Sequence, residues 1–120
     1  MSIEEFINGI DDISVNSELV AEIEGIYEIS LSDYLGKILS FNAEGYFFGN
    51  NKRLLSINEI KTAEEDLHVC FKLLKMLPLF DTGDNDFVVY SFEDNTWKLF
   101  NIIDKCDFYQ SADLKSLLLI

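Results

Sequence analysis

The chain contains few of the residues that mark specialised folds. Among its 120 residues are one Pro, six Gly, two Cys and one His. So little Pro and Gly excludes collagen-like and low-complexity chains. Two cysteines cannot build a disulfide framework, and in their apolar surroundings we expect Cys70 and Cys106 to be buried, reduced thiols. The most apolar stretches, 73–80 and 117–120, are shorter than the roughly 20 residues that span a bilayer.

The N-terminal segment lacks the features of a secretory signal. Residues 1–6 contain no base and no apolar run. We therefore expect a cytoplasmic protein. Its length predicts a single domain, residues 1–120, since domains cluster at roughly 100–150 residues.

Positive charge is also scarce. Nine Lys and Arg stand against 22 Asp and Glu, for a net charge of −13, and residues 1–36 contain no Lys or Arg. A body of this charge repels phosphate, so we expect neither nucleic acid nor an anionic membrane as a ligand, but a basic protein. The hydrophobic content of 48% excludes a disordered acidic tail.

Apolar residues at helical spacing predict three helices in the first third of the chain. Each begins at a side chain that can cap it. The expected limits are a short helix opening with the Ser2–Glu5 capping box, a second from Asn16 or Ser17 to Gly25, and a third from Ser32 to Asn42.

The rest of the chain is rich in short aromatic and β-branched segments separated by turn residues. The expected strands are 45–49, 53–57, 87–92 and 97–102. Helical spacing over 59–76 predicts one helix or two, and Pro78 limits Leu77–Phe80 to a short or edge strand. Ser111 is expected to cap a last helix that runs through Leu118. Helices, then hairpins, then a closing helix indicate an α+β fold with a central antiparallel sheet.

Three segments resemble the SUKH superfamily, which comprises bacterial immunity proteins and a fungal regulator of cell-wall synthesis. They are Ile23-Glu24 with Ile29–Tyr34 and Ile38-Leu39, then Leu54–Ile60, then Leu77–Phe87, and the resemblance extends over roughly residues 20–118. The resemblance implies a SUKH-like α+β domain without catalysis. It also implies that the protein binds and neutralises a polymorphic toxin, often a nuclease domain, which is basic because it binds phosphate. The expected assembly is a monomer or a weak homodimer.

A partner-binding patch is predicted where two turns are dense in acids. If the turns lie near one another, their carboxylates can attract a basic partner, and an aromatic ring beside them can anchor it. The candidate residues are Asp81, Asp84, Asp86, Glu93, Asp94 and Trp97. The same residues also suit ordinary solvated turns and a core tryptophan.

The sequence offers two further acidic features, one in the N-terminal helices and one in the 81–86 turn. The N-terminal helices form a second candidate surface, through Glu4, Glu5, Asp11, Asp12, Glu18, Glu22, Glu24 and Glu28. The 81–86 turn lacks the spacing of a Ca²⁺ loop, so we expect no metal site there, and no cofactor elsewhere.

Catalytic motifs are absent from the sequence. His68 is expected to be partly buried, and neither a His/Cys metal cluster nor a phosphate loop or nucleophile elbow occurs. The protein is therefore not expected to be an enzyme. Two alternatives stay open: an intracellular adaptor of the same fold that binds a host protein, and a hydrolase that uses buried carboxylates.

Overall fold

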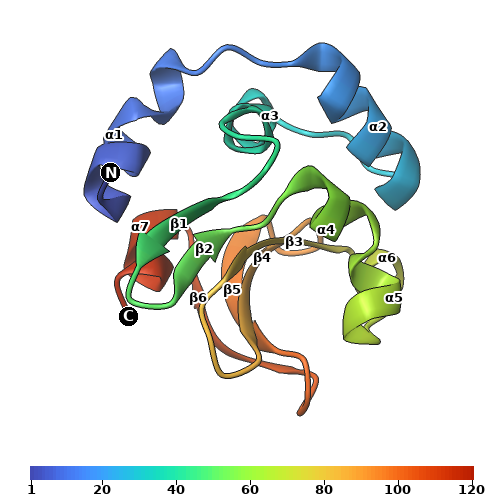
Figure 1. Cartoon of the computed structure of the whole chain (residues 1–120). Coiled ribbons are helices and arrows are strands. Elements are labelled where there is room, and N and C mark those ends of the chain that lie inside the picture. The colour runs from blue at the N-terminus through green and yellow to red at the C-terminus, as the bar shows by residue number, and fades with distance from the viewer.

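The computed structural model describes residues 1–120 and shows an α+β fold built on one six-stranded sheet (Figure 1). The strands follow one another in chain order, and every neighbouring pair is antiparallel. They are β1 (Tyr46–Gly49), β2 (Lys52–Leu54), β3 (Met76–Asp81), β4 (Asp86–Ser91), β5 (Thr96–Asn101) and β6 (Cys106–Ser111). The predicted fold class is confirmed.

The predicted N-terminal helices form as α1 (Ile3–Gly9), followed by the 3₁₀ turn η1 (Ile10–Asp12), α2 (Ser17–Tyr27) and α3 (Asp33–Ser40). Ser2, Asn16 and Ser32 cap them as expected. The prediction that the second helix ends at Gly25 is wrong. It continues to the buried Tyr27, and Glu28 ends it in the left-handed conformation, φ 56°.

The 59–76 segment divides into three short helices, α4 (Ile57–Lys61), α5 (Ala63–Leu67) and α6 (Phe71–Leu74). Ser56 caps the first of them, so the strand predicted over 53–57 ends early, at Leu54. His68 and Lys75 take left-handed conformations at the ends of α5 and α6. These breaks let Val69 and Phe71 enter the core, which one continuous helix would not allow.

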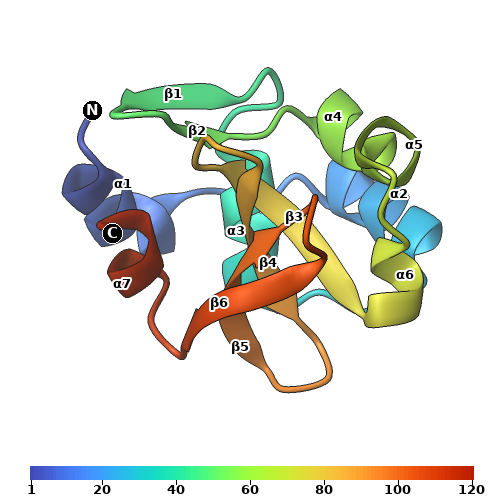
Figure 2. The ribbon, with the colours of Figure 1, turned by 90° about the horizontal axis from the view of Figure 1, so that it is seen from below.

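The central strands of the sheet, β3 to β5, are buried on both faces. Phe6 of α1 packs edge-on against Phe80 of β3, with ring centroids 6.1 Å apart. Phe80, Val88 and Leu99 lie opposite one another on neighbouring strands and therefore share one face of the sheet. Phe100 follows Leu99 and so points to the other face, where it packs against Phe71 of α6. One core of 27 buried hydrophobic residues results, with α1 and α3 on one side of the sheet and α4–α6 on the other (Figures 1 and 2).

Pro78 lies in an interior strand, which corrects the prediction of a short or edge strand. β3 is paired on both sides, with β2 and β4. The pairing of β2 with β3 covers Phe80 and Asp81, and a register shift falls between Pro78 and Phe80. Pro78 therefore lies beyond the end of β2 and next to a bulge, where a missing N–H donor costs no ladder bond.

The end of the chain differs from the prediction in two ways. A sixth strand, β6, occupies Cys106–Ser111, and the last helix, α7 (Leu114–Leu118), is capped by Asp113 rather than by Ser111. Residues 106–110 are all exposed, so no alternation of buried and exposed residues announces this strand. None of the helices combines the length and the apolar character that a membrane crossing requires.

Candidate binding surface

The two predicted acidic turns lie at opposite ends of β4. The turn with Asp81, Asp84 and Asp86 precedes this strand, and the turn with Glu93 and Asp94 follows it. Six strand residues at about 3.3 Å each place the turns roughly 20 Å apart. The carboxylates predicted to form one patch are therefore divided into two groups.

Two of the carboxylates at the first turn are engaged within the fold. Asp81 Oδ2 lies 3.3 Å from Arg53 Nη2, and its Oδ1 accepts a hydrogen bond from the Gly83 amide. Asp86 Oδ1 accepts a hydrogen bond of 2.8 Å from the side-chain amide of Asn101. Asp84 is exposed and makes no such bond. The side chain at this turn that is free to meet a partner is therefore Asp84.

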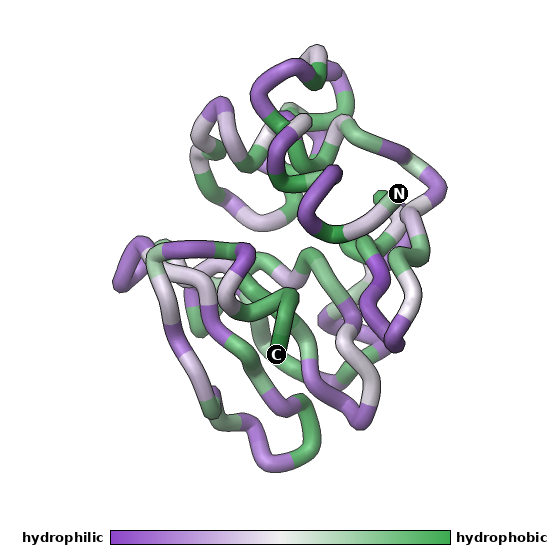
Figure 3. Tube along the Cα trace, turned by 90° about the vertical axis from the view of Figure 1, so that its left-hand side faces the viewer, coloured by the Kyte–Doolittle hydropathy of each residue, from purple (hydrophilic) through white to green (hydrophobic).

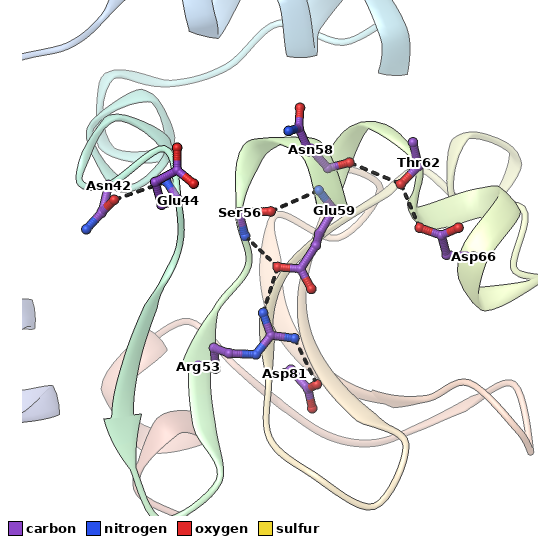
Figure 4. Close-up of polar contacts among 9 residues, drawn as sticks. All are labelled: Asn42, Glu44, Arg53, Ser56, Asn58, Glu59, Thr62, Asp66 and Asp81. Carbon is purple, nitrogen blue, oxygen red and sulfur yellow. Dashed lines mark hydrogen bonds and ion pairs between the residues drawn. The ribbon is translucent and has the colours of Figure 1, made fainter.

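Arg53 joins strands and helix through a network of charges (Figure 4). Its Nη1 lies 2.6 Å from Glu59 Oε1, and the Ser56 amide donates to that same oxygen. The hydrogen bond from Arg53 lowers the pKa of Glu59 and outweighs the opposing effect of burial. The hydrogen bond to Glu59 in turn raises the pKa of Arg53. This network holds β2 and β3 to the start of α4, so it is a structural element of the fold.

The second turn is also partly neutralised. Lys98 Nζ lies 2.5 Å from Asp94 and 4.0 Å from Asp107 of β6. The hydrogen bond with Asp94 raises the pKa of Lys98. Glu93 is exposed and has no ion-pair partner. Trp97 is only 4% exposed and packs edge-on against Tyr90, so its ring belongs to the core and is not accessible as an anchor.

Three bases pair with acids of the N-terminal helices, one within α3 and two from later elements. Ion pairs join Lys37 to Asp33, Lys61 to Glu22 and Lys72 to Glu28. Two further carboxylates accept hydrogen bonds from backbone amides. Glu5 accepts from the Ser2 amide in the capping box, and this hydrogen bond lowers the pKa of Glu5. Glu24 accepts from the Leu31 amide. The side chains that remain without such partners are Glu4, Asp11, Asp12 and Glu18.

A shallow acidic groove lies where α2 meets the loop before β1 and the start of α4. Its volume is about 280 Å³, and its walls include Glu18, Glu22 and Glu44. Glu22 is paired with Lys61, whereas Glu18 and Glu44 have no cationic partner. Sequence reasoning did not include Glu44, because it lies outside the acidic helices and only the fold brings it to them.

Summed over the chain, most carboxylates have no cationic partner. Seven of the 22 acids form ion pairs, which leaves 15, and five of the nine bases do so, which leaves four. The bases without an ion pair are Lys52, Lys75, Lys105 and Lys115. The surface is thus strongly anionic even after every pairing in the fold is counted.

The largest hollow has a different character. It measures about 430 Å³, lies between the end of α2 and the α6–β3 junction, and has an apolar floor with Lys72 and Lys75 at its rim. The Tyr27 hydroxyl in its wall donates a 2.6 Å hydrogen bond to the Ile60 carbonyl, and burial raises its pKa. Leu73, 81% exposed, belongs to the same α6.

The cysteines and the histidine are placed differently from the predictions. Cys70, Cys106 and His68 are all exposed rather than buried. His68 ends α5 in a left-handed conformation, which directs its backbone away from the helix. No group of three His, Cys, Asp or Glu side chains has the arrangement that could hold a metal ion.

The chain was compared with models of protein families, with curated proteins and with solved structures. None of the three comparisons finds a match.

Proposed function

We propose that this chain is a non-catalytic binding protein that recognises a basic protein. The observation that carries the proposal is the imbalance of free charges: 15 carboxylates without an ion-pair partner against four such bases. Self-repulsion among these carboxylates costs stability. A cationic partner offsets that cost when it binds, and the field of the carboxylates accelerates its approach.

The specific form of the proposal is an immunity protein that blocks a toxic nuclease domain. Nucleases bind phosphate and therefore present basic surfaces, which an anionic body can cover. The resemblance of residues 20–118 to the SUKH superfamily supports the same function, as well as a cytoplasmic location. The free acids at Asp84, Glu93 and Glu18 provide contacts at three places on the surface.

The second candidate function is an adaptor that binds a host protein. It is favoured by the hollow beside α6, where exposed leucines adjoin Lys75, a base without an ion pair; Lys72 in the same wall is paired with Glu28. An apolar surface with basic residues suits an acidic or amphipathic partner rather than a nuclease. The two functions therefore use different parts of the surface.

The test is a titration with a basic nuclease domain, taken from the C-terminus of a large secreted protein where a neighbouring gene encodes one. Association and dissociation rates are measured at 50 and 500 mM NaCl. We expect the association rate to fall at least tenfold in high salt while the dissociation rate changes little, because salt screens long-range attraction. Absence of binding, or association that salt leaves unchanged, contradicts the proposal.

Charge reversals then locate the contact. Asp84→Lys, Glu93→Lys and Glu18→Lys each replace an exposed acid that makes no ion pair, so the fold is preserved. At least one is expected to slow association about threefold or more. Lys75→Glu reports on the adaptor surface, and a loss of binding confined to it favours the second candidate.

A further inference from the structure

Strand β6 is an open edge of the sheet. It pairs with β5 alone, and residues Cys106–Gln110 are exposed. In Figure 2 it lies in front of β4 and β5 with no helix before it. The other edge strand, β1, has four residues against six in β6. An edge of this length offers backbone N–H and C=O groups to an added strand.

Apolar side chains accompany this free edge. Phe108 and Tyr109 are 53% and 55% exposed. The pairing of β5 with β6 shifts between Leu99 and Phe100, so Phe108 has no residue opposite it, and its ring is left without a cross-strand neighbour. Of the devices by which natural edges prevent strand addition, Pro and Lys are absent from the strand, whereas the bulge at Phe108 and the charge of Asp107 are present.

The two predicted acidic turns lie at the two ends of this same edge. Asp86 of β4 pairs with Asn101 of β5, and Asn101 pairs with Cys106 of β6. The turn before β4 therefore lies at the same end of the sheet as the start of β6. Trp97 is opposite Ser111, so the turn with Glu93 and Asp94 adjoins its end. Asp104 and Asp113 also flank the strand, and Lys105, a base without an ion pair, directly precedes its first residue. Strand β6 therefore lies between two groups of carboxylates, one near each of its ends.

We infer that β6 is the docking site of the basic partner, which adds an extended segment to the sheet as a seventh strand. Apolar residues of the segment cover Phe108 and Tyr109, and Lys or Arg at its ends meet the flanking carboxylates. A second copy of this chain is disfavoured as the occupant, because each copy carries a net charge of −13. The inference rests on the proposed function and specifies its site.

The test uses a ten-residue peptide that alternates Val with Lys and Arg, and a second peptide in which Glu replaces every Lys and Arg. Binding to the full chain is followed by backbone hydrogen exchange and by alkylation of the two exposed thiols. We expect the cationic peptide to slow exchange along β6 and to slow alkylation of Cys106 at least fivefold. Cys70, which lies in the connection between α5 and α6, is the internal control and should react as before.

A matched pair of variants tests the same edge. Phe108→Lys and Phe47→Lys make the same change at exposed rings of the two edge strands. Phe108→Lys should weaken binding of the cationic peptide at least tenfold, and Phe47→Lys less than twofold. Equal effects of the two variants overturn the inference.

The outcomes separate this inference from the proposed function. Protection by the cationic peptide outside β6, or no protection anywhere, overturns strand addition and leaves a basic partner to bind elsewhere. Binding of the acidic peptide at least as tight as that of the cationic peptide contradicts the proposed function as well. Protection of β6 without peptide that rises with protein concentration identifies a second copy as the occupant and also overturns the inference.

Discussion

Two glycines show how differently one residue type can act within this chain. Gly45, before β1, has φ of +83°, and a Cβ there would lie 2.7 Å from the Leu54 carbonyl oxygen. Gly25 lies within α2, and nothing is within 4 Å of its Cβ position. Gly45→Ala should therefore lower the free energy of unfolding by about 2–4 kcal/mol. Gly25→Ala should raise it by about 0.5–1 kcal/mol. Urea unfolding measures both, and effects of the same sign would contradict the structure.

Glu59 links the stability of the fold to pH. Its hydrogen bond from Arg53 lowers its pKa in the folded state. A carboxyl with a lowered folded pKa contributes stability above its unfolded pKa, near 4.3, and loses that contribution as pH falls through the folded value. Because the two side chains are 35% and 42% exposed, solvent screening limits the contribution to about 1 kcal/mol.

Glu59→Gln should thus lower the free energy of unfolding by about 1 kcal/mol at pH 7, and the difference from the original chain should shrink as the pH falls below about 4.3 and vanish once Glu59 is protonated in the folded protein. Unfolding by urea across this range measures it. Glu65→Gln is the control, because Glu65 is exposed and makes no ion pair. A difference between Glu59→Gln and the original chain that stays constant as the pH falls from 7 to below the folded pKa of Glu59 would show that charge is not the source.

Helix α7 closes the core at the end of the chain. Leu118 is 1% exposed, whereas the next residue, Leu119, is 52% exposed. Leu118→Ala should cost about 2–4 kcal/mol through the cavity that it leaves, and Leu119→Ala less than about 0.5 kcal/mol. Thermal and urea unfolding compare the two. Figure 3 shows the very end of the chain in green, and residues 117–120 are all hydrophobic, so hydropathy does not distinguish the two leucines. Equal losses would place α7 outside the core.

At the scale of elements, strands β4 and β5 could be predicted from the sequence, and strand β6 could not. The 87–92 segment was predictable because it is rich in aromatic and β-branched residues, and the 97–102 segment because apolar and polar residues alternate from Trp97 to Leu99; they correspond to β4 and β5. β6 has five exposed residues in succession, so its strand conformation depends on hydrogen bonds with β5 rather than on a pattern of its own.

Charge acts on the molecule as a whole. Its 15 unpaired carboxylates repel one another in the folded state more than in the expanded unfolded chain. Raising NaCl from 20 to 300 mM shortens the Debye length from about 20 Å to about 6 Å. We therefore expect the melting temperature to rise by several degrees, measured by circular dichroism.

Removing charge should reduce this response to salt. Asp12→Asn, Glu18→Gln and Glu65→Gln together remove three exposed acids that make no ion pair. The triple variant should melt higher than the original chain at 20 mM NaCl and should gain less from added salt. A melting temperature that does not depend on salt in either protein would contradict repulsion as a cost.

Local interactions account for what could be predicted of this chain. Helix caps at Ser2 and Ser32, turn residues at 81–85 and the aromatic and β-branched residues of β4 act over a few residues, and the net charge is a property of composition. The partners of the acids are different, because Asp81 meets Arg53, Asp86 meets Asn101 and Lys98 meets Asp107 across strands. The separation of the two acidic turns follows from the predicted strand 87–92 between them, whereas folding alone determined which carboxylates stay free. The physical reason is that strand register and helix packing join residues far apart in sequence, and no local pattern encodes those distances.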